Sequence, residues 1–245
     1  MKNHPFLETA LFTFDEVLST GLTEKGALSL LANLKTKGVI VRLRKGLYAT
    51  INPITKGLYA SRYEIGCAIH PGGVIGYLSA LNYYGLSHQA NQEVTVITPL
   101  RYGEEDVEGV IYRFVSDDAE RDLLALFVNA PLRVCSIERA VVDCLDRPDI
   151  CGGMEEIWNC LRGLRYLDEK KVVSNLEAKN TKLLYKKVGF VLEKLGVKGL
   201  SPVFYDLCKQ RMSNRRDDLR DYPSEPGLSS REWNLAYPEY MKEAE

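Results

Sequence analysis

Residues 23–49 read TEKGALSLLANLKTKGVIVRLRKGLYA, and this stretch decides how the N-terminal part of the chain folds. Thr23 commonly caps the start of a helix, and Gly38 is typical of the residue just past a helix end. Between them the apolar residues keep the i, i+3, i+4, i+7 spacing of one helical face; they are Ala27, Leu30, Leu31 and Leu34. The stretch therefore predicts a helix over residues 24–37 that packs one face inward.

A hairpin is expected directly after this helix. Residues 39–44 alternate between two faces as in a β-strand, Lys45 and Gly46 form a turn, and residues 47–49 return as a second strand. Upstream, FTFDEVL (residues 12–18) predicts a shorter helix. Two helices followed by a basic hairpin are typical of a winged helix-turn-helix domain, which we place at residues 1–60.

The polar positions of this domain favour binding to double-stranded DNA. The outer face of the helix carries small or basic side chains, as a helix in the major groove requires; they are Lys25, Ser29, Asn33 and Lys37. The hairpin carries Arg42, Arg44 and Lys45 near its tip, where a wing meets the phosphate backbone. The alternative is a winged domain that contacts only proteins and keeps these charges in solvent.

The distribution of charge supports the same interpretation. The chain of 245 residues has a net charge of −1, but residues 1–62 hold nine Lys and Arg against four Asp and Glu. The remaining residues hold 23 basic and 29 acidic side chains. A basic N-terminal segment on an acidic body suggests that one end of the protein meets a polyanion.

Residues 61–245 are expected to form a second domain in which a small sheet is packed with helices, so that the whole chain is α+β. Strands are predicted at 93–98, 109–116 and 132–136. Helices are predicted at 62–69, 74–86, 136–146, 154–166, 168–179, 181–195 and 202–211. The tail, residues 212–245, is charged and proline-containing but keeps aromatic residues that can anchor an extended strap. Its basic residues, with Lys186 and Lys187, form either a second DNA or partner surface or a solvated mixture with nearby acids; they are Arg211, Arg215, Arg216 and Arg220.

Several functional classes find no support in the sequence. No run of about 18 apolar residues occurs, and the start of the chain lacks an apolar export segment, so we expect a cytoplasmic protein that does not enter a membrane. The six cysteines include no CxxC pair, and only three histidines occur, so buried reduced thiols are favoured over a zinc site. No glycine-rich nucleotide-binding motif is present, and we expect no cofactor.

Residues 138–153, ERAVVDCLDRPDICGG, suggest a catalytic site at first sight. Pro148-Asp149 followed by residues 168–170 (DEK) imitates the motif of metal-dependent nucleases, and Cys144 is a possible nucleophile. Helical spacing instead places Cys144 on the apolar face of a helix capped by Ser136.

The charged residues of that helix are expected on an exposed face. Arg139 and Asp143, and Asp143 and Arg147, would form i, i+4 pairs worth about 0.3–0.5 kcal/mol each. We expect this segment to be structural, and the protein not to be an enzyme. A nuclease-like C-terminal domain remains the alternative.

Three segments resemble the AbiEi-type antitoxins, which are transcriptional regulators of abortive-infection systems. They are RLRKGLYAT (42–50), HPGGVIGYLSALNYYGLSHQ (70–89) and SIERAVVDCLDRPDICGGMEEIW (136–158), and the tail RDYPSEPGLSSREWNLAYP (220–238) is also similar. The resemblance covers essentially the whole chain.

The resemblance implies a winged-helix domain followed by an antitoxin domain. It implies repression of the protein's own operon through inverted repeats, and neutralisation of a nucleotidyltransferase toxin encoded beside it. The family's basic recognition surface corresponds to Lys25, Lys37, Arg42, Arg44 and Lys45, while Ser29 and Asn33 follow from helix geometry. We expect a monomer or weak dimer that pairs on DNA.

Overall fold

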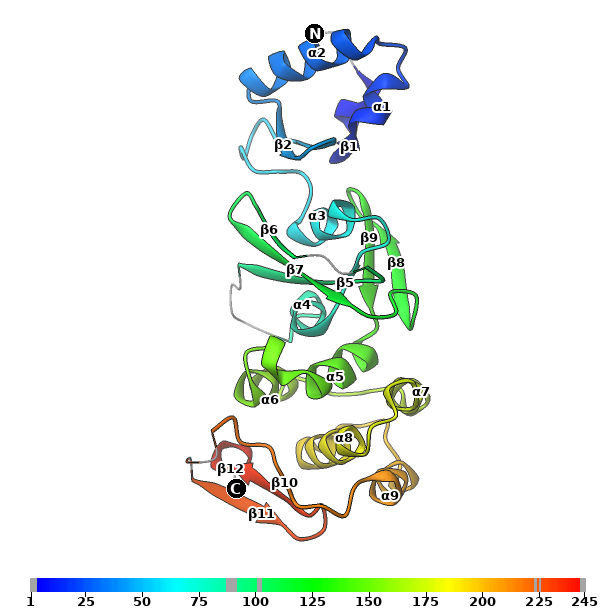
Figure 1. Cartoon of the computed structure of the whole chain (residues 1–245), viewed down its shortest axis with the longest axis vertical. Coiled ribbons are helices and arrows are strands. Elements are labelled where there is room, and N and C mark those ends of the chain that lie inside the picture. The colour runs from blue at the N-terminus through cyan, green and yellow to red at the C-terminus, as the bar shows by residue number, and fades with distance from the viewer. Residues whose placement is uncertain (1–3, 87–91, 101–102, 223, 225, 243–245) are drawn as a thin grey trace. The chain divides into compact units, whose positions relative to one another are not determined.

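The computed structural model describes residues 4–86, 92–100, 103–222, 224 and 226–242. The chain is α+β, and its described strands form one six-stranded and two three-stranded sheets (Figure 1). It divides into two compact units, residues 1–75 with 91–134 and residues 76–90 with 135–245. This division differs from the expected boundary at residue 60, because the N-terminal elements share a unit with the six-stranded sheet.

The first unit begins with a short 3-10 helix and a three-stranded sheet that carries two helices. The elements are η1 (Pro5–Glu8), β1 (Leu11–Thr13), α1 (Phe14–Leu18), α2 (Glu24–Thr36), β2 (Ile40–Arg44) and β3 (Leu47–Thr50). The strand order is β1-β3-β2, with both pairings antiparallel. The expected helix over residues 12–18 is therefore too long at its start. Thr13 accepts a hydrogen bond from the Glu16 amide and donates its own amide to the Glu16 carboxylate, which fixes the first helical residue at Phe14.

Helix α2 agrees with its prediction. The Thr23 hydroxyl caps it by accepting from the Gly26 amide at 3.2 Å, and Gly38 follows its end with a φ of 64°. Ala27, Leu31 and Leu34 are buried, while Leu30 is half-buried against the same core. This core also contains Phe12 and Tyr48, whose stacked rings are 5.5 Å apart and join β1 to β3.

The six-stranded sheet has the order β6-β7-β5-β4-β9-β8. Its strands are β4 (Val74–Ile75), β5 (Glu93–Thr98), β6 (Glu104–Val107), β7 (Val110–Ser116), β8 (Leu123–Phe127) and β9 (Pro131–Cys135). Helix α3 (Arg62–Ile69) packs on β4 and β5. Gly66 permits this approach, because a Cβ at that position would lie 3.2 Å from side-chain atoms of Ile75, Val96 and Tyr112.

The predicted strands at 93–98, 109–116 and 132–136 and the helix at 62–69 are confirmed, but the sheet contains three strands that the sequence did not predict. The helix predicted over 74–86 begins as β4, and only Tyr77–Tyr83 is helical (α4). Residues 104–107 contain three acids, a composition that disfavours strands, and form one anyway at the edge of the sheet. Residues 123–127 are uniformly apolar and lack the alternation that indicates a half-buried strand.

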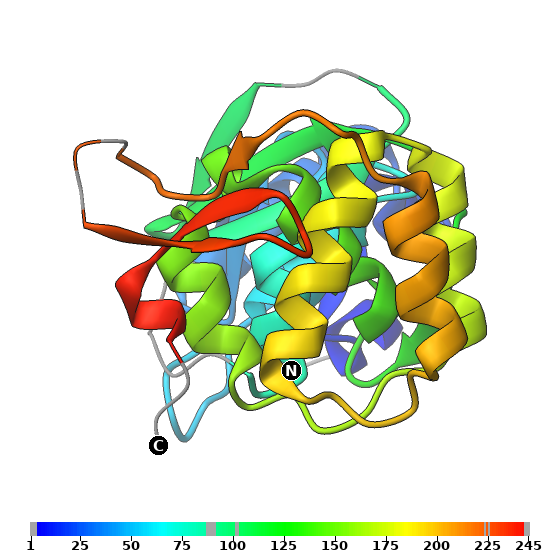
Figure 2. The same ribbon diagram turned by 90° about the horizontal axis from the view of Figure 1, so that it is seen from below.

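The second unit is mainly helical (Figure 2). Besides α4 it contains α5 (Ile137–Asp146), α6 (Met154–Leu161), α7 (Glu169–Lys179), α8 (Lys182–Leu195) and α9 (Pro202–Arg211). These helices match the predictions, except that α6 ends at Leu161 and not near residue 166. No helix among the described residues is both long and apolar enough to cross a membrane.

The tail forms a small sheet that lies against α8 (Figure 2). Its strands are β10 (Asp217–Asp218), β11 (Gly227–Ser230) and β12 (Leu235–Pro238), in the order β10-β12-β11. Trp233 is buried against Gly189 of α8, where an added Cβ would lie 2.3 Å from the indole ring. The Trp233 ring nitrogen donates to Glu193 at 2.6 Å. The predicted anchoring by apolar side chains is confirmed for Leu219, Trp233, Leu235 and Tyr237, whereas Tyr222 is exposed. The tail was expected to be an extended strap and is instead a three-stranded sheet.

Helix α5 corrects one prediction and confirms another. Cys144 is fully buried, as predicted, and burial raises the pKa of its thiol. The polar face was expected to be exposed, yet Arg139 and Asp143 are both 0% exposed. The reason is that α5 packs against α4, α6, α7 and α8, so neighbouring helices cover its polar side as well as its apolar side.

The polar groups of α5 are satisfied within the second unit. The Arg139 Nε donates to Asp143 at 3.1 Å, and the Lys179 ammonium lies 3.6 Å from the other oxygen of that carboxylate. The Glu138 carboxylate accepts from the Asp168 amide at 3.0 Å. Arg147 was expected to pair with Asp143 but instead binds Asp149. Glu138, Arg139 and Asp143 thus form a buried polar cluster that connects α5 to α7 and to its cap.

Candidate nucleic-acid interface

Helix α2 presents a row of polar side chains to solvent. Its apolar face is fixed in the N-terminal core, and the opposite side carries residues spaced four apart, all exposed: Lys25, Ser29, Asn33 and Lys37. At 1.5 Å per residue the row is about 18 Å long. Glu24, at the very start of the helix, is its single acid, and an acid there is favourable to the helix dipole. The row therefore combines positive charge with two hydrogen-bonding side chains on one rigid element.

The β2–β3 hairpin presents two of its three predicted basic residues to solvent. Gly46 makes the turn with a φ of 83°, and Lys45 beside it is exposed. Arg42 is exposed too, and its Nε donates to the Arg44 carbonyl at 3.2 Å. A register shift between Arg42 and Arg44 bends β2 at this point. The pairing thus places Arg42 and Lys45 together near the hairpin tip.

Arg44 is directed elsewhere. Its guanidinium donates to the Ile69 carbonyl at 2.7 Å, and it lies 3.4 Å from the Glu105 carboxylate. Glu105 also lies 2.9 Å from the Nε2 of His70, whose ring packs edge-on against Phe114. Arg44 therefore joins the hairpin to α3 and β6 and does not extend the surface of Arg42 and Lys45. Sequence reasoning could not find this role, because the partners lie 25 and 61 residues further along the chain.

The basic residues of the tail do not form one open surface. The Lys186 ammonium is buried and donates to Asp217 at 2.7 Å and to the Arg215 carbonyl at 2.6 Å. Arg220 is held by Asp218, and Arg216 donates to Ser229. Most of this charge is used in contacts inside the second unit. The alternative expected these charges to be solvated, and the burial of Lys186 differs from it.

The three acids of the nuclease alternative, Asp149, Asp168 and Glu169, each have a structural contact. Asp149 binds Arg147 at 2.8 and 2.9 Å, and this bond holds the pKa of the carboxyl below its usual value. The Asp168 side chain caps α7, and Glu169 accepts from the Ser201 amide. In the part of the chain that the structure describes, no three His, Cys, Asp or Glu side chains are placed together to hold a metal ion.

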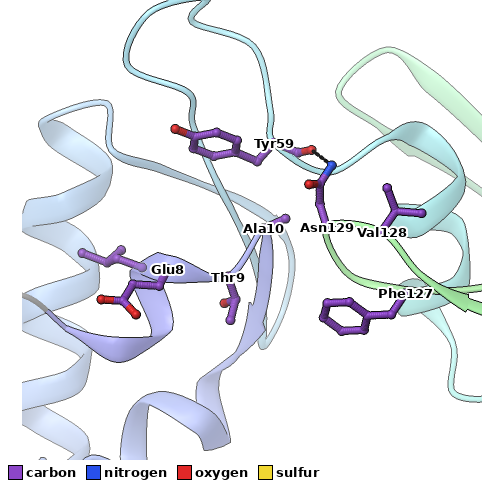
Figure 3. A pocket seen from close by; sticks show the side chains of 8 residues that line it. Glu8, Thr9, Ala10, Tyr59, Phe127, Val128 and Asn129 are labelled. Atoms are coloured by element: carbon purple, nitrogen blue, oxygen red, sulfur yellow. Dashed lines mark hydrogen bonds between the residues drawn. The ribbon is translucent and has the colours of Figure 1, made fainter.

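A pocket that the sequence did not indicate lies within the first unit (Figure 3). It has a volume of about 480 Å³. One wall comes from the η1–β1 segment and the other from the turn between β8 and β9; the lining residues are Leu7, Glu8, Thr9, Ala10, Tyr59, Phe127, Val128 and Asn129. The Asn129 side-chain amide donates to the Tyr59 carbonyl at 3.2 Å and closes one end. The one signal in the sequence is the uncharged run 123–130, LLALFVNA, and apolar composition alone does not indicate a pocket.

Comparison with known proteins gives a likeness of fold. No family model and no curated protein matches the chain. A solved structure, the RV2827C protein from Mycobacterium tuberculosis, superposes with a TM-score of 0.61 at 14% sequence identity. The likeness covers 93% of this chain and 86% of that one. The two chains share an architecture, and at this identity the likeness carries no statement about activity.

Proposed function

We propose that this protein is a DNA-binding transcriptional repressor whose first 60 residues act as a winged helix-turn-helix domain. The observation that carries the proposal is the row of Lys25, Ser29, Asn33 and Lys37, exposed along one helix whose opposite face is held in a core. A charged surface alone would suit many partners. A rigid helix that offers amide, hydroxyl and ammonium groups in one line suits the edges of bases in the major groove.

The roles of the individual residues follow from their chemistry. Asn33 has the amide that pairs with the two hydrogen-bonding atoms of adenine, and the Ser29 hydroxyl can donate to or accept from several bases. Lys25 and Lys37 lie at the two ends of the row, where phosphates flank the groove. Arg42 and Lys45 on the hairpin contact the backbone and so fix the orientation of the helix. Arg44 supports the hairpin from behind through Ile69 and Glu105.

We further propose that the protein is the antitoxin of a type IV toxin–antitoxin system. This part rests on the sequence resemblance to the AbiEi-type regulators. In this proposal two copies of the protein bind the inverted repeats of its own operon, and a nucleotidyltransferase toxin is the functional partner. Residues 61–245, which include the buried polar cluster of α5 and the anchored tail, are then the antitoxin domain and carry no catalytic step.

The DNA-binding proposal is tested by fluorescence anisotropy with the DNA upstream of the protein's own gene. The Asn33→Ala variant should weaken specific binding by the equivalent of about 1–3 kcal/mol and relax the preference at one base position. The Arg42→Ala/Lys45→Ala variant should weaken binding to all sequences and reduce the slope of log affinity against log salt by about 2. Lys170→Ala is the matched control, since it removes an exposed lysine of α7 in the second unit. Equal affinities for wild type, variants and control would contradict the proposal.

The antitoxin proposal needs a separate experiment. Co-expression with the nucleotidyltransferase encoded by the neighbouring gene should restore growth that the enzyme alone arrests. The DNA-binding variants distinguish repression from neutralisation, because they should lose the first and keep the second when both genes are driven by an unrelated promoter. Growth arrest that persists with the wild-type protein would contradict this proposal without affecting the first.

A further inference from the structure

The two edges of the six-stranded sheet are chemically different. At one edge, β6 carries Glu104, Glu105 and Asp106 in succession. At the other, β8 reads LLALF, and the uncharged run continues to residue 130. Charged side chains at an edge strand discourage pairing with another strand, whereas an apolar edge with free backbone groups invites it. The β6 edge is protected in this way and the β8 edge is not.

Strand β8 exposes apolar side chains on both of its faces. Leu124 and Leu126 are 43% and 40% exposed, and Phe127 and Val128, at the end of the strand, are 74% and 59% exposed. Leu124 and Leu126 lie on one face of the strand and Phe127 on the other, so exposed apolar side chains flank the edge on both sides. No lysine or proline interrupts residues 123–127. In the part of the chain that the structure describes, β9 is the one strand beside β8.

The exposed turn after β8 is held firmly in place. The buried Glu64 carboxylate of α3 accepts from the Asn129 amide at 2.7 Å and from the Ala130 amide at 2.6 Å. The Asn129 side chain adds its bond to the Tyr59 carbonyl. Phe127 and Val128 are thus presented by a turn with fixed backbone bonds, and Phe127 stands at the wall of the neighbouring pocket (Figure 3). An interaction surface that is already ordered loses little conformational entropy on binding.

We propose that β8 is the surface through which two copies of this chain associate, strand against strand and antiparallel about a twofold axis. A twofold contact sets one patch against the same patch of the second copy, so the patch must be compatible with itself. Pairing centred on Ala125 sets residues 123–127 against the same residues of the second copy, and none of them is charged. The β6 edge would set carboxylates against carboxylates. The charge pattern therefore selects self-association at one edge and forbids it at the other.

The size of the patch predicts a weak dimer. Stable specific interfaces bury about 800 Å² on each partner, and the apolar residues of β8 supply only part of that. The pocket beside Phe127 offers the incoming strand further area to bury. We therefore expect a dimer that dissociates on dilution.

The consequence for DNA rests on the proposed function. Strand β8 belongs to the same compact unit as α2. Pairing through β8 would therefore bring two copies of the α2 row to a defined separation. DNA with two half-sites would then stabilise the weak dimer, and binding to it would be cooperative.

Analytical ultracentrifugation of the full chain without DNA tests the surface directly. The sedimentation coefficient of the wild type should rise with concentration between about 1 and 300 μM, as expected for an interface below the usual size. The Phe127→Lys and Leu124→Lys variants should stay monomeric throughout, a change of at least tenfold in the dissociation constant. Val203→Lys is the matched control, since it replaces an apolar residue of α9 that is about as exposed as Phe127, and it should leave the wild-type behaviour unchanged. Circular dichroism confirms that each variant is folded.

Three outcomes would overturn the proposal. They are a wild-type chain that stays monomeric at the highest concentration, Lys variants that dimerise like the wild type, and a control that loses association with them. A wild-type chain that stays monomeric would indicate that β8 pairs with a strand of a different protein and not with a second copy. Loss of DNA binding would contradict the proposed function and leave these sedimentation results unchanged. Conversely, variants that keep half-site affinity but lose cooperativity on a two-site DNA would support both.

Discussion

Helices α2 and α5 have the same spacing of apolar residues, but the polar side of α2 is exposed and that of α5 is buried. Each has apolar residues at i, i+3, i+4 and i+7 and a polar side opposite them. Helix α2 packs against α1 and β2, so its polar row stays in solvent. Helix α5 packs against four other helices, so Arg139 and Asp143 become part of the interior. A polar helix face is therefore exposed to solvent in one unit and buried as an internal contact in the other, and the packing partners decide between the two.

The largest effect on stability is expected at the buried Arg139–Asp143 pair of α5. Asp143→Ala leaves Arg139 buried without its carboxylate and should lower the free energy of unfolding by about 3–5 kcal/mol. Urea denaturation followed by circular dichroism measures it. A loss below about 1 kcal/mol, the range of an exposed pair, would mean that the α5 charges behave like surface charges and that the contrast with α2 is wrong.

The double variant Arg139→Met/Asp143→Leu sharpens this result. It removes both charges and keeps similar volumes, so it should be markedly more stable than the Asp143→Ala variant. Lys179, which also approaches Asp143, limits the recovery because it loses a partner. A double variant as unstable as the single one would show that the hydrogen bonds themselves, and not the cost of one unpaired charge, dominate.

An intermediate effect is expected on the apolar side of α2. Leu31→Ala removes a buried side chain from the N-terminal core and should cost about 2–5 kcal/mol. DNA affinity measured on the remaining folded fraction should be nearly unchanged, because Leu31 faces away from the polar row. A specific loss of affinity in the folded fraction would place the recognition surface elsewhere.

Substitutions on the polar side of α2 should leave stability nearly unchanged and weaken DNA binding. Replacing Lys25 or Lys37 by Ala should change the free energy of unfolding by no more than about 0.5 kcal/mol, the usual range for surface positions. The same variants should weaken DNA binding at low salt more than at high salt. Thermal unfolding and anisotropy titrations on the same samples give both numbers, and a variant that loses stability as much as affinity would break the comparison with α5.

The smallest effect concerns pH around α5. The Lys187 ammonium donates to the Leu145 carbonyl at the end of that helix, and burial lowers the pKa of Lys187. A lowered folded-state pKa means that the protonated lysine destabilises the fold. Stability should therefore rise as pH increases through the folded pKa towards the unfolded value of about 10.4. The Lys187→Met variant should lack this rise in unfolding experiments between about pH 8 and 10, and an identical pH profile would refute the assignment.

Much of the helical framework could be predicted from the sequence, because local groups decide it. Thr23, Ser136 and Asp168 cap their helices with their own side chains, and the glycine after α2 ends it. The strands β6 and β8 could not be predicted, because neither segment has the residue pattern of a strand. Each forms a strand only because folding brings it beside one other strand at an edge of the sheet. The same holds for the candidate site. The row on α2 depends on helical spacing alone, whereas the contacts of Arg44 depend on residues brought near by the folding of the sheet.

The close approach of Gly189 to Trp233 has a consequence for the divergence of related sequences. Any side chain at position 189 would enter the space of the indole ring, so the tail and the middle of α8 constrain each other across a long stretch of sequence. Descendants that retain the tryptophan should retain the glycine, and in those that lose the tail a side chain at this position would still meet Cys208 of α9, whose Cβ lies 2.9 Å from the position of an added Cβ.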